Sequence, residues 1–372
     1  MPLISPFPAS RFFDLHRLLA LTPGPSNHEG PRRLVLEEHL HACDVRTTTD
    51  PADNLWVHMG SGPWEDTIVF DAHVDVVERG YAREVIHGAD TLQGLGVGDD
   101  LVAVTMLALL AEQLADERGA LERPLSILFS VGEEGLGNLR GVRQVVADHQ
   151  TAPWAFVSFD GSLDRCANVG LGSLRYRLRV SCPGGHSWGN YGAPNAIDQL
   201  TDALAVLRAA HRKVAGSVDA PVSWNMGTIN GGQGINSIAR MAEATFECRS
   251  TCPQALSRID RAFAEALRPI RAREHVKVMR RVIGRRPAAQ AVHPERLVPV
   301  ATAVLKETGI EPEFKPASTN INAPLAAGWP ALCMGLCICG NAHREDEFVQ
   351  LDSLPKGWRC LSRLLEELVV RK

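Results

Sequence analysis

The sequence predicts an α/β fold: a mostly parallel sheet flanked by helices, into which a small ferredoxin-like α+β domain is inserted. In the first half, apolar runs of strand length alternate with amphipathic stretches of helix length. From about Leu171 the order changes to β-α-β-β-α-β, which is typical of a ferredoxin-like unit. After Pro287 the α/β alternation returns, so the first domain closes around the insertion.

Each element follows from its local pattern. In the first half, strands are expected at Thr67–Phe70, Leu125–Val131 and Ala155–Phe159, and helices at Phe12–Leu21, Gly30–His41 and Leu101–Asp116. In the insertion, strands are expected at Ser173–Ser181, Val222–Asn230, Ala239–Arg249 and His275–Ile283, and helices at Pro194–Lys213 and Pro253–Leu267. A helix at Pro294–Thr308, a strand at Ala331–Cys339 and a helix at Leu354–Val370 follow. The predicted domain limits are 1–171, 172–286 and 287–372.

Bulk properties exclude several classes of protein. A length of 372 residues allows two domains, and a net charge of -4 gives no reason to expect a nucleic-acid partner. No apolar run is long enough to span a membrane. The segment Met1–Leu21 carries Arg11 and Asp14 among its apolar residues, so it does not read as a signal peptide. A cytoplasmic location is expected.

The nine cysteines are odd in number and lack a framework spacing, which favours reduced thiols over disulfides. Cys333, Cys337 and Cys339 do cluster, so a thiolate metal site is one interpretation. No CxxC pair occurs, however, and we expect these three residues to act as small hydrophobes in a buried strand.

Five short segments carry acids and histidines, and four of them close a predicted strand. In the first, His73 and Asp75 lie two residues apart, which places both side chains on one face of the strand. The carboxylate can then hold the far nitrogen of a metal-binding imidazole. The alternative is a histidine satisfied within the core.

The second segment, Gly94–Asp100, opens the predicted helix at Leu101. Its glycines suggest a dinucleotide site, but no strand is predicted directly before them, and Asp99 and Asp100 would repel a pyrophosphate. An ordinary helix cap would explain the two aspartates. Two adjacent acids can also place one carboxylate between two cations.

The remaining segments supply Glu133 and Glu134, then Asp160, then His343, each directly after an apolar strand. Neighbouring glutamates often form only a solvated turn. Carboxyl ends of parallel strands meet at one edge of a sheet, where ligands bind. Two histidines and at least three carboxylates gathered there suit a pair of divalent cations such as zinc, with one carboxylate bridging them.

The ordered set HxD, GDD, GEEG, FDG and AHxxDE resembles the co-catalytic zinc peptidases and amidohydrolases, which include peptidase T, carboxypeptidase G, aminoacylase and acetylornithine deacetylase. The resemblance runs from His73 to Glu347 and implies two divalent ions per subunit, zinc, or else cobalt or manganese. It implies that His73 and Asp160 bind one ion, that Glu134 and His343 bind the other, and that Asp99 bridges them.

The same resemblance implies that Glu133 is the general base, that Asp75 supports His73, and that the Asp99–Asp100 peptide is cis. In the insertion, His186 is similar to a lid histidine that reaches the partner subunit's active site, which implies a homodimer formed through a lid and dimerisation domain.

Asn236 and Arg249 resemble residues of that family that contact a substrate carboxylate. A glycine turn around His186 and a solvated charge at Arg249 are the simpler interpretations. Asn320 stands where many relatives have aspartate.

The expected function is a dinuclear metal hydrolase of amide bonds in short peptides, acting as an aminopeptidase, dipeptidase or carboxypeptidase. An N-acyl amino acid deacylase is the alternative, although Asp160 favours the peptidases because deacetylase relatives tend to have glutamate there. A catalytically silent metal-stabilised dimer would not need an intact Glu133. A serine hydrolase is a further alternative. Residues 185–189 (Gly-His-Ser-Trp-Gly) match the G-x-S-x-G pattern, but they do not join a predicted strand directly to a predicted helix, as a nucleophile elbow does.

Overall fold

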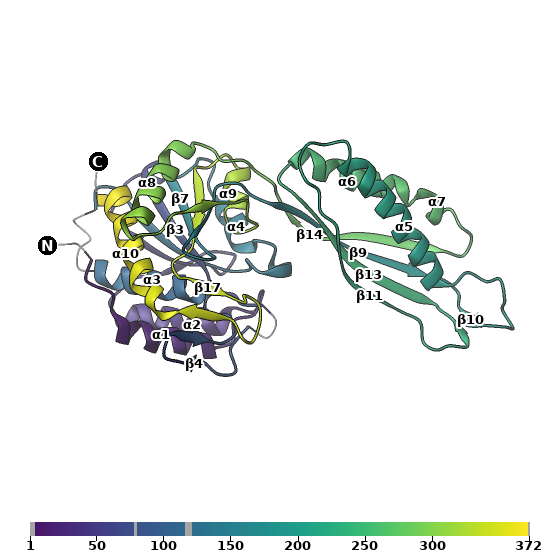
Figure 1. Cartoon of the computed structure of the whole chain (residues 1–372), viewed down its shortest axis with the longest axis horizontal. Helices are drawn as coiled ribbons and strands as arrows, with labels where there is room; N and C mark the ends of the chain where they lie inside the picture. Colours follow the sequence, from purple (N-terminus) through teal and green to yellow (C-terminus); the bar gives the residue numbers. More distant parts are fainter. Residues whose placement is uncertain (1–3, 78–79, 116–120, 371–372) are drawn as a thin grey trace. The chain divides into compact units, whose positions relative to one another are not determined.

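The computed structural model describes residues 4–77, 80–115 and 121–370 (Figure 1). Asp116, where the third predicted helix ended, lies outside these residues. So do residues 1–3 and 371–372, at the two ends of the predicted α/β domain. The chain divides into two compact units. We call Met1–Gly170 together with Gln290–Lys372 the main unit, and Leu171–Ala289 the inserted unit.

The main unit is built on an eight-stranded sheet in the order β1-β2-β6-β3-β7-β16-β8-β15. Its four central strands are parallel: β6 (Leu125–Ser130), β3 (Ile68–His73), β7 (Ala155–Phe159) and β16 (Ala331–Met334). Every residue of these four strands is buried, as expected of a parallel sheet with both faces covered. The outer strands are β1 (Thr48–Thr49), β2 (Leu55–Met59), β8 (Arg165–Ala167) and β15 (Glu313–Phe314).

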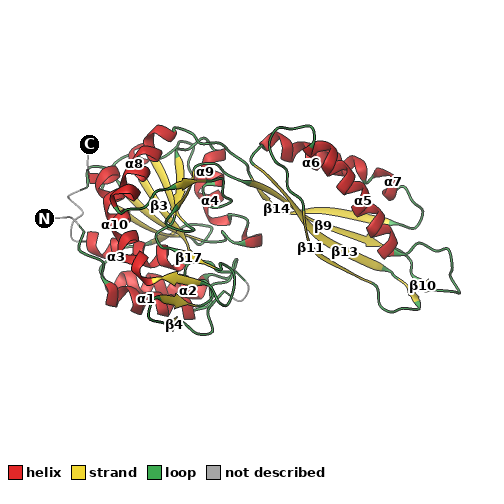
Figure 2. Ribbon diagram, in the orientation of Figure 1, coloured by secondary structure: helices red, strands yellow, loops and turns green. Residues whose placement is uncertain are grey.

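Helices cover this sheet (Figure 2). They are α1 (Ala9–Leu21), α2 (Gly30–Ala42), α3 (Leu101–Leu114), α4 (Arg140–Asp148), α8 (Pro294–Glu307), α9 (Asn322–Ala326) and α10 (Leu354–Leu365), which continues as a π-helical turn over Glu366–Val370. All residues of α3 except Gln113 are buried, because α3 packs against both β3 and the outer helices α1 and α2. A helix that is apolar all round belongs in such a position.

The apolar run Ala331–Cys339 does not form one strand, so that prediction is wrong. The chain leaves the sheet at Gly335, where a side chain would collide with the backbone of Gly161 and Ser162. It then enters a second small sheet with strand order β17-β18-β5-β4. These strands are β17 (Cys339–Gly340), β18 (Phe348–Gln350), β5 (Thr91–Gln93) and β4 (Ile86–His87).

The three clustered cysteines therefore lie in different places: Cys333 in β16, Cys337 in the following loop and Cys339 in β17. None of them belongs to a potential metal-binding group of the described residues. All nine cysteines of the chain are unpaired. Within the described ranges, no helix has both the length and the apolar character that a membrane span requires.

The inserted unit has the predicted β-α-β-β-α-β order. Its antiparallel sheet runs β11-β13-β9-β14, formed by β9 (Gly172–Ser181), β11 (Asn225–Gly231), β13 (Met241–Ser250) and β14 (Lys277–Arg286). The helices α5 (Ala196–Ala215) and α6 (Pro253–Ala266) pack on one face of it, and α7 (Arg268–Arg271) follows α6 (Figure 2). In the core between the two layers, Tyr176 stacks on Phe246, and Phe263 packs edge-on against both rings.

Beyond the end of β9, β10 (Gly185–His186) pairs with β12 (Ser237–Ile238).

Candidate metal centre

The carboxyl ends of three neighbouring strands supply the first residues of the centre. His73 is the last residue of β3, Glu133 and Glu134 follow β6, and Asp160 follows β7. Because β6, β3 and β7 are parallel neighbours, their carboxyl ends meet at one edge of the sheet. The position of each side chain is thus a direct consequence of strand order.

Asp99 lies between the two histidines. One of its carboxylate oxygens is 3.1 Å from His73 Nε2, and the other is 3.2 Å from His343 Nε2. His343 Nε2 is also 2.9 Å from a carboxylate oxygen of Glu134. His343 comes from the loop after β17, a part of the chain remote in sequence from the other residues of the centre. Asp99 has one oxygen to offer on each side, as a bridging carboxylate requires.

Two groups of three potential ligand atoms result, and they share Asp99. One consists of His73, Asp99 and Asp160, and the other of Asp99, Glu134 and His343, with the ligand atoms of each group within 4.8 Å of one another. A third group joins Glu133 to His73 and Glu134. The structure therefore brings together all five predicted ligands and the predicted base.

Asp75 fixes the turn that carries the two glutamates. Its carboxylate accepts the backbone N–H groups of Glu133 and Glu134, both at 2.9 Å, and the hydroxyl of Ser26 at 2.7 Å. Its carboxylate lies 3.6 Å from His73 Nδ1, whereas its backbone carbonyl oxygen lies 2.9 Å from that nitrogen. Asp75 thus orients both the imidazole and the glutamate turn, the first mainly through its backbone.

Asp100 occupies the N-cap position of α3, but its side chain makes no capping hydrogen bond, so a side-chain cap does not explain this aspartate. Its buried carboxylate instead accepts the backbone N–H of His73 at 3.1 Å. The Asp99–Asp100 peptide bond is cis, as the family resemblance implied.

The electrostatics of the centre favour cations. Burial, and then the charge of Asp99, raises the pKa of Asp160 well above its usual range. The same two causes raise the pKa of Glu134 to about 7. Hydrogen bonds to Asp99 and Glu134 raise the pKa of His343 to about 11, so a proton on this ring partly offsets the negative charge.

Four carboxylates and two imidazoles thus crowd one partly enclosed edge of the sheet. Divalent ions would replace the protons and remove the repulsion between the acids. A mixture of imidazole and carboxylate donors is the chemistry that zinc and similar ions select. The residues present therefore fit a pair of divalent ions.

Glu347 organises the centre although our sequence analysis gave it no role. Its buried carboxylate accepts the backbone N–H groups of Gly96, Gly98 and Asp99 at 2.8–3.0 Å, and that of His343 at 3.3 Å. Burial, and then the charge of Asp99, raises the pKa of Glu347 to about 7. The signal for this role was an acid four residues after a ligand histidine.

Asn320 is part of a buried polar network directly behind the centre. Its amide nitrogen donates to a carboxylate oxygen of Asp71 at 3.0 Å and to the hydroxyl of Ser130 at 2.8 Å. The Ser158 hydroxyl donates to the same Asp71 oxygen at 2.6 Å. Burial raises the pKa of Asp71 to about 6. An amide suits this position because it supplies the two donors that the network uses.

His186, Asn236 and Arg249 lie in the inserted unit. His186 is exposed in β10, and its Nδ1 accepts the backbone N–H groups of Trp188 and Gly189 at 3.3 and 3.2 Å. The carbonyl of Asn236 accepts the N–H of Ser187 at 3.0 Å, so Asn236 lies beside His186.

Arg249 is near the opposite end of the inserted sheet, because it pairs with Ser173 at the start of β9, whereas β10 follows the end of β9. Its guanidinium contacts Glu247 at 2.8 Å.

Comparison with known proteins finds relatives that match nearly the whole chain. An acetylornithine deacetylase from Edwardsiella ictaluri is 24% identical, with 97% of this chain and 98% of that protein covered. A succinyl-diaminopimelate desuccinylase from Stenotrophomonas maltophilia is 27% identical, with 90% of each covered.

Among solved structures, a tripeptidase from Staphylococcus aureus has the same fold, with a TM-score of 0.79 at 15% identity over 98% of this chain and 99% of that one. Aminopeptidase PepT from Bacillus cereus gives 0.72 at 17% identity, with the same shares covered. The model of peptidase family M20/M25/M40 matches residues 69–367. The chain therefore belongs to this family of metal-dependent hydrolases.

Proposed function

We propose that the protein hydrolyses amide bonds in short peptides, using two zinc ions held by His73, Asp99, Glu134, Asp160 and His343. The observation that carries this proposal is the pair of three-ligand groups that share Asp99. Each oxygen of Asp99 faces a different histidine. The unpaired cysteines fit a reducing compartment, and we place the protein in the cytoplasm.

Divalent ions in these positions would acidify a water molecule and polarise the scissile carbonyl. Glu133 is the residue that moves protons. Its backbone is held by Asp75, and its side chain is buried beside His73 and Glu134. Glu133 takes the proton from the attacking water and delivers it to the amine nitrogen that leaves.

His186 is suited to donate a hydrogen bond to the oxyanion. Two backbone N–H groups point at its Nδ1, which must therefore be the acceptor nitrogen. The ring proton then lies on Nε2, on an exposed side chain. A neutral imidazole in this tautomer donates through Nε2 to the negative charge that develops on the substrate oxygen.

The distance between the two ends of the inserted sheet supports an active site that is built from two subunits. The strand from Met241 to Arg249 extends about 27 Å, so His186 and Asn236 cannot touch the same short substrate as Arg249 of the same chain. We propose a homodimer formed through the inserted unit. In it, Arg249 binds the substrate carboxylate, and the partner subunit's His186 and the partner subunit's Asn236 complete the site.

An N-acyl amino acid deacylase is the second candidate. The curated relatives named above favour it, since they are named as a deacetylase and a desuccinylase. Asp160 favours a peptidase, because the peptidases that the chain resembles have aspartate at this ligand position, whereas deacetylase relatives tend to have glutamate. Both reactions cut an amide next to a carboxylate-bearing group and use the same residues.

One experiment tests the proposal. The purified protein is stripped with a chelator, reloaded with zinc, cobalt or manganese, and assayed with dipeptides, tripeptides, their C-terminal amides and N-acyl amino acids. Hydrolysis of free peptides should need metal and should fall for the amides. Full turnover of the stripped protein would refute the metal mechanism, and equal kcat/KM for acid and amide would refute the carboxylate contact.

A further inference from the structure

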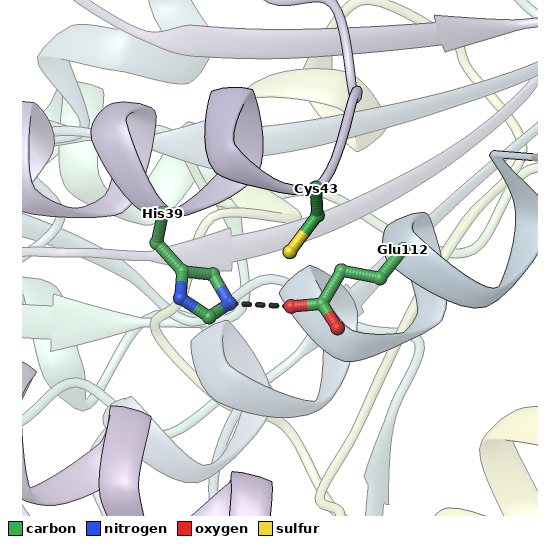
Figure 3. A group of neighbouring side chains, drawn as sticks. All are labelled: His39, Cys43 and Glu112. Atoms are coloured by element: carbon green, nitrogen blue, oxygen red, sulfur yellow. Dashed lines mark hydrogen bonds and ion pairs between the residues drawn. The ribbon is translucent and has the colours of Figure 1, made fainter.

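A second cluster of metal-ligating side chains lies on the helices of the main unit (Figure 3). His39 and Cys43 are four residues apart at the C-terminal end of α2, so both side chains lie on the same side of the helix. Glu112 comes from the last turn of α3, which packs against α2. The three ligand atoms, a nitrogen, a sulfur and an oxygen, lie within 4.8 Å of one another.

This cluster is separate from the centre described above. Glu112 lies 11 residues beyond Leu101, the first residue of α3, which corresponds to about 16 Å along the helix axis. The centre lies before the start of that helix, at Asp99. The two groups have no residue in common.

Each polar contact of the cluster involves Glu112 or Arg11. One Glu112 carboxylate oxygen contacts His39 Nε2, and the other is 2.6 Å from an Arg11 guanidinium nitrogen. The same Arg11 nitrogen donates to the sulfur of Cys43 at 3.4 Å. The Glu112 side chain is 4% exposed, whereas that of Arg11 is 57% exposed. The charge of the nearly buried Glu112 carboxylate is thus balanced by Arg11, an exposed cation that can move into solvent at little cost.

Figure 3 shows the imidazole, the thiol and the carboxylate pointing toward a common point between α2 and α3. We propose that this cluster binds a zinc ion through His39 Nε2, Cys43 Sγ and a Glu112 carboxylate oxygen, with water as the fourth ligand. Nitrogen, thiolate sulfur and carboxylate oxygen are the donors that zinc takes in a tetrahedral site.

Binding releases the thiol proton of Cys43 to solvent, and Arg11 leaves the carboxylate that the ion then occupies. The thiolate and the carboxylate together balance the charge of the ion. The ion would tie the end of α2 to α3.

The test uses cobalt as a spectroscopic substitute for zinc in the full-length protein, with a non-thiol reductant. A cobalt–thiolate bond gives a charge-transfer band in the near ultraviolet, and the proposed ligands of the centre include no cysteine. Cys43→Ser should remove this band and lower the metal content by one equivalent per chain. His39→Gln should also lower the metal content by one equivalent.

Two matched controls use the same substitution at other half-buried cysteines, Cys252→Ser in the inserted unit and Cys339→Ser in the main unit. Both controls should keep the band and the full metal content. Arg11→Ala removes the cation that competes for Glu112 and should tighten zinc binding roughly fivefold. Because Cys43 and His39 are both partly exposed, their variants are expected to fold, which circular dichroism checks.

The proposal is overturned if Cys43→Ser keeps the band, or if its metal content equals that of the wild type. Weaker zinc binding in Arg11→Ala would also overturn it, since the cluster would then be an ion-pair network that needs its arginine. The readouts are metal content and absorption, so they do not depend on which substrate the enzyme hydrolyses.

Discussion

Replacing Glu347 by glutamine should weaken both the stability of the main unit and the binding of metal. The Glu347 carboxylate holds two separate loops, since one oxygen accepts the N–H groups of Gly98 and Asp99 and the other those of Gly96 and His343. Glutamine keeps one acceptor oxygen. Its amide nitrogen would face two backbone donors that then have no acceptor.

The magnitude follows from the number of donors left without a partner. A buried donor without an acceptor costs about 1–3 kcal/mol, so the two together cost about 2–6 kcal/mol. Asp99 and His343 are both held by this carboxylate and are both proposed ligands. A looser loop therefore lowers metal affinity as well as stability, although Glu347 itself binds no ion in the proposal.

The assay is denaturant unfolding of the metal-free protein, combined with titration of the folded variant with zinc. Asp346→Asn is the control, since Asp346 is exposed in the same loop and solvent screens its contacts with Arg344 and Asn341. A stability loss in Glu347→Gln no larger than in this control would refute the reasoning. So would an unchanged zinc affinity.

Four further predictions follow. Glu133→Gln should keep the bound metal but lose activity by roughly 10²–10⁴-fold, measured as turnover beside metal content. Mixed dimers of Glu133→Gln and His186→Ala subunits should regain part of the activity, and verified mixed dimers without recovery would contradict a site shared between subunits. Asn320→Asp should destabilise the protein by about 1–3 kcal/mol in denaturant unfolding, because it removes two donors and places an acid beside Asp71. Burial lowers the pKa of His16 to about 4. The free energy of unfolding that the neutral ring contributes is therefore complete above pH 6.5 and is lost as pH falls toward 4. In denaturant unfolding between these pH values, His16→Gln should reduce that loss by up to about 3 kcal/mol.

The sequence was sufficient to predict the fold class and the order of the elements, because hydrophobic periodicity is a local property. It was also sufficient to predict that histidines and carboxylates gather at one edge of the sheet. His73, Glu134 and Asp160 each follow a central strand of a parallel sheet, and the ends of such strands converge whatever the details of packing. The family resemblance supplied the assignment of all five residues as ligands, and it also supplied the place of Asp99 between the two ions.

Other features depend on contacts between distant parts of the chain, and only the tertiary structure decides these. The Glu347 carboxylate meets Gly98 across 249 residues, and no local pattern encodes that hydrogen bond. The end of β16 is set by the close approach of Gly335 to Gly161, not by the apolar run that continues past it. The cluster of His39, Cys43 and Glu112 exists because α2 packs on α3, since periodicity gives each helix its apolar face but does not specify which helix that face will meet.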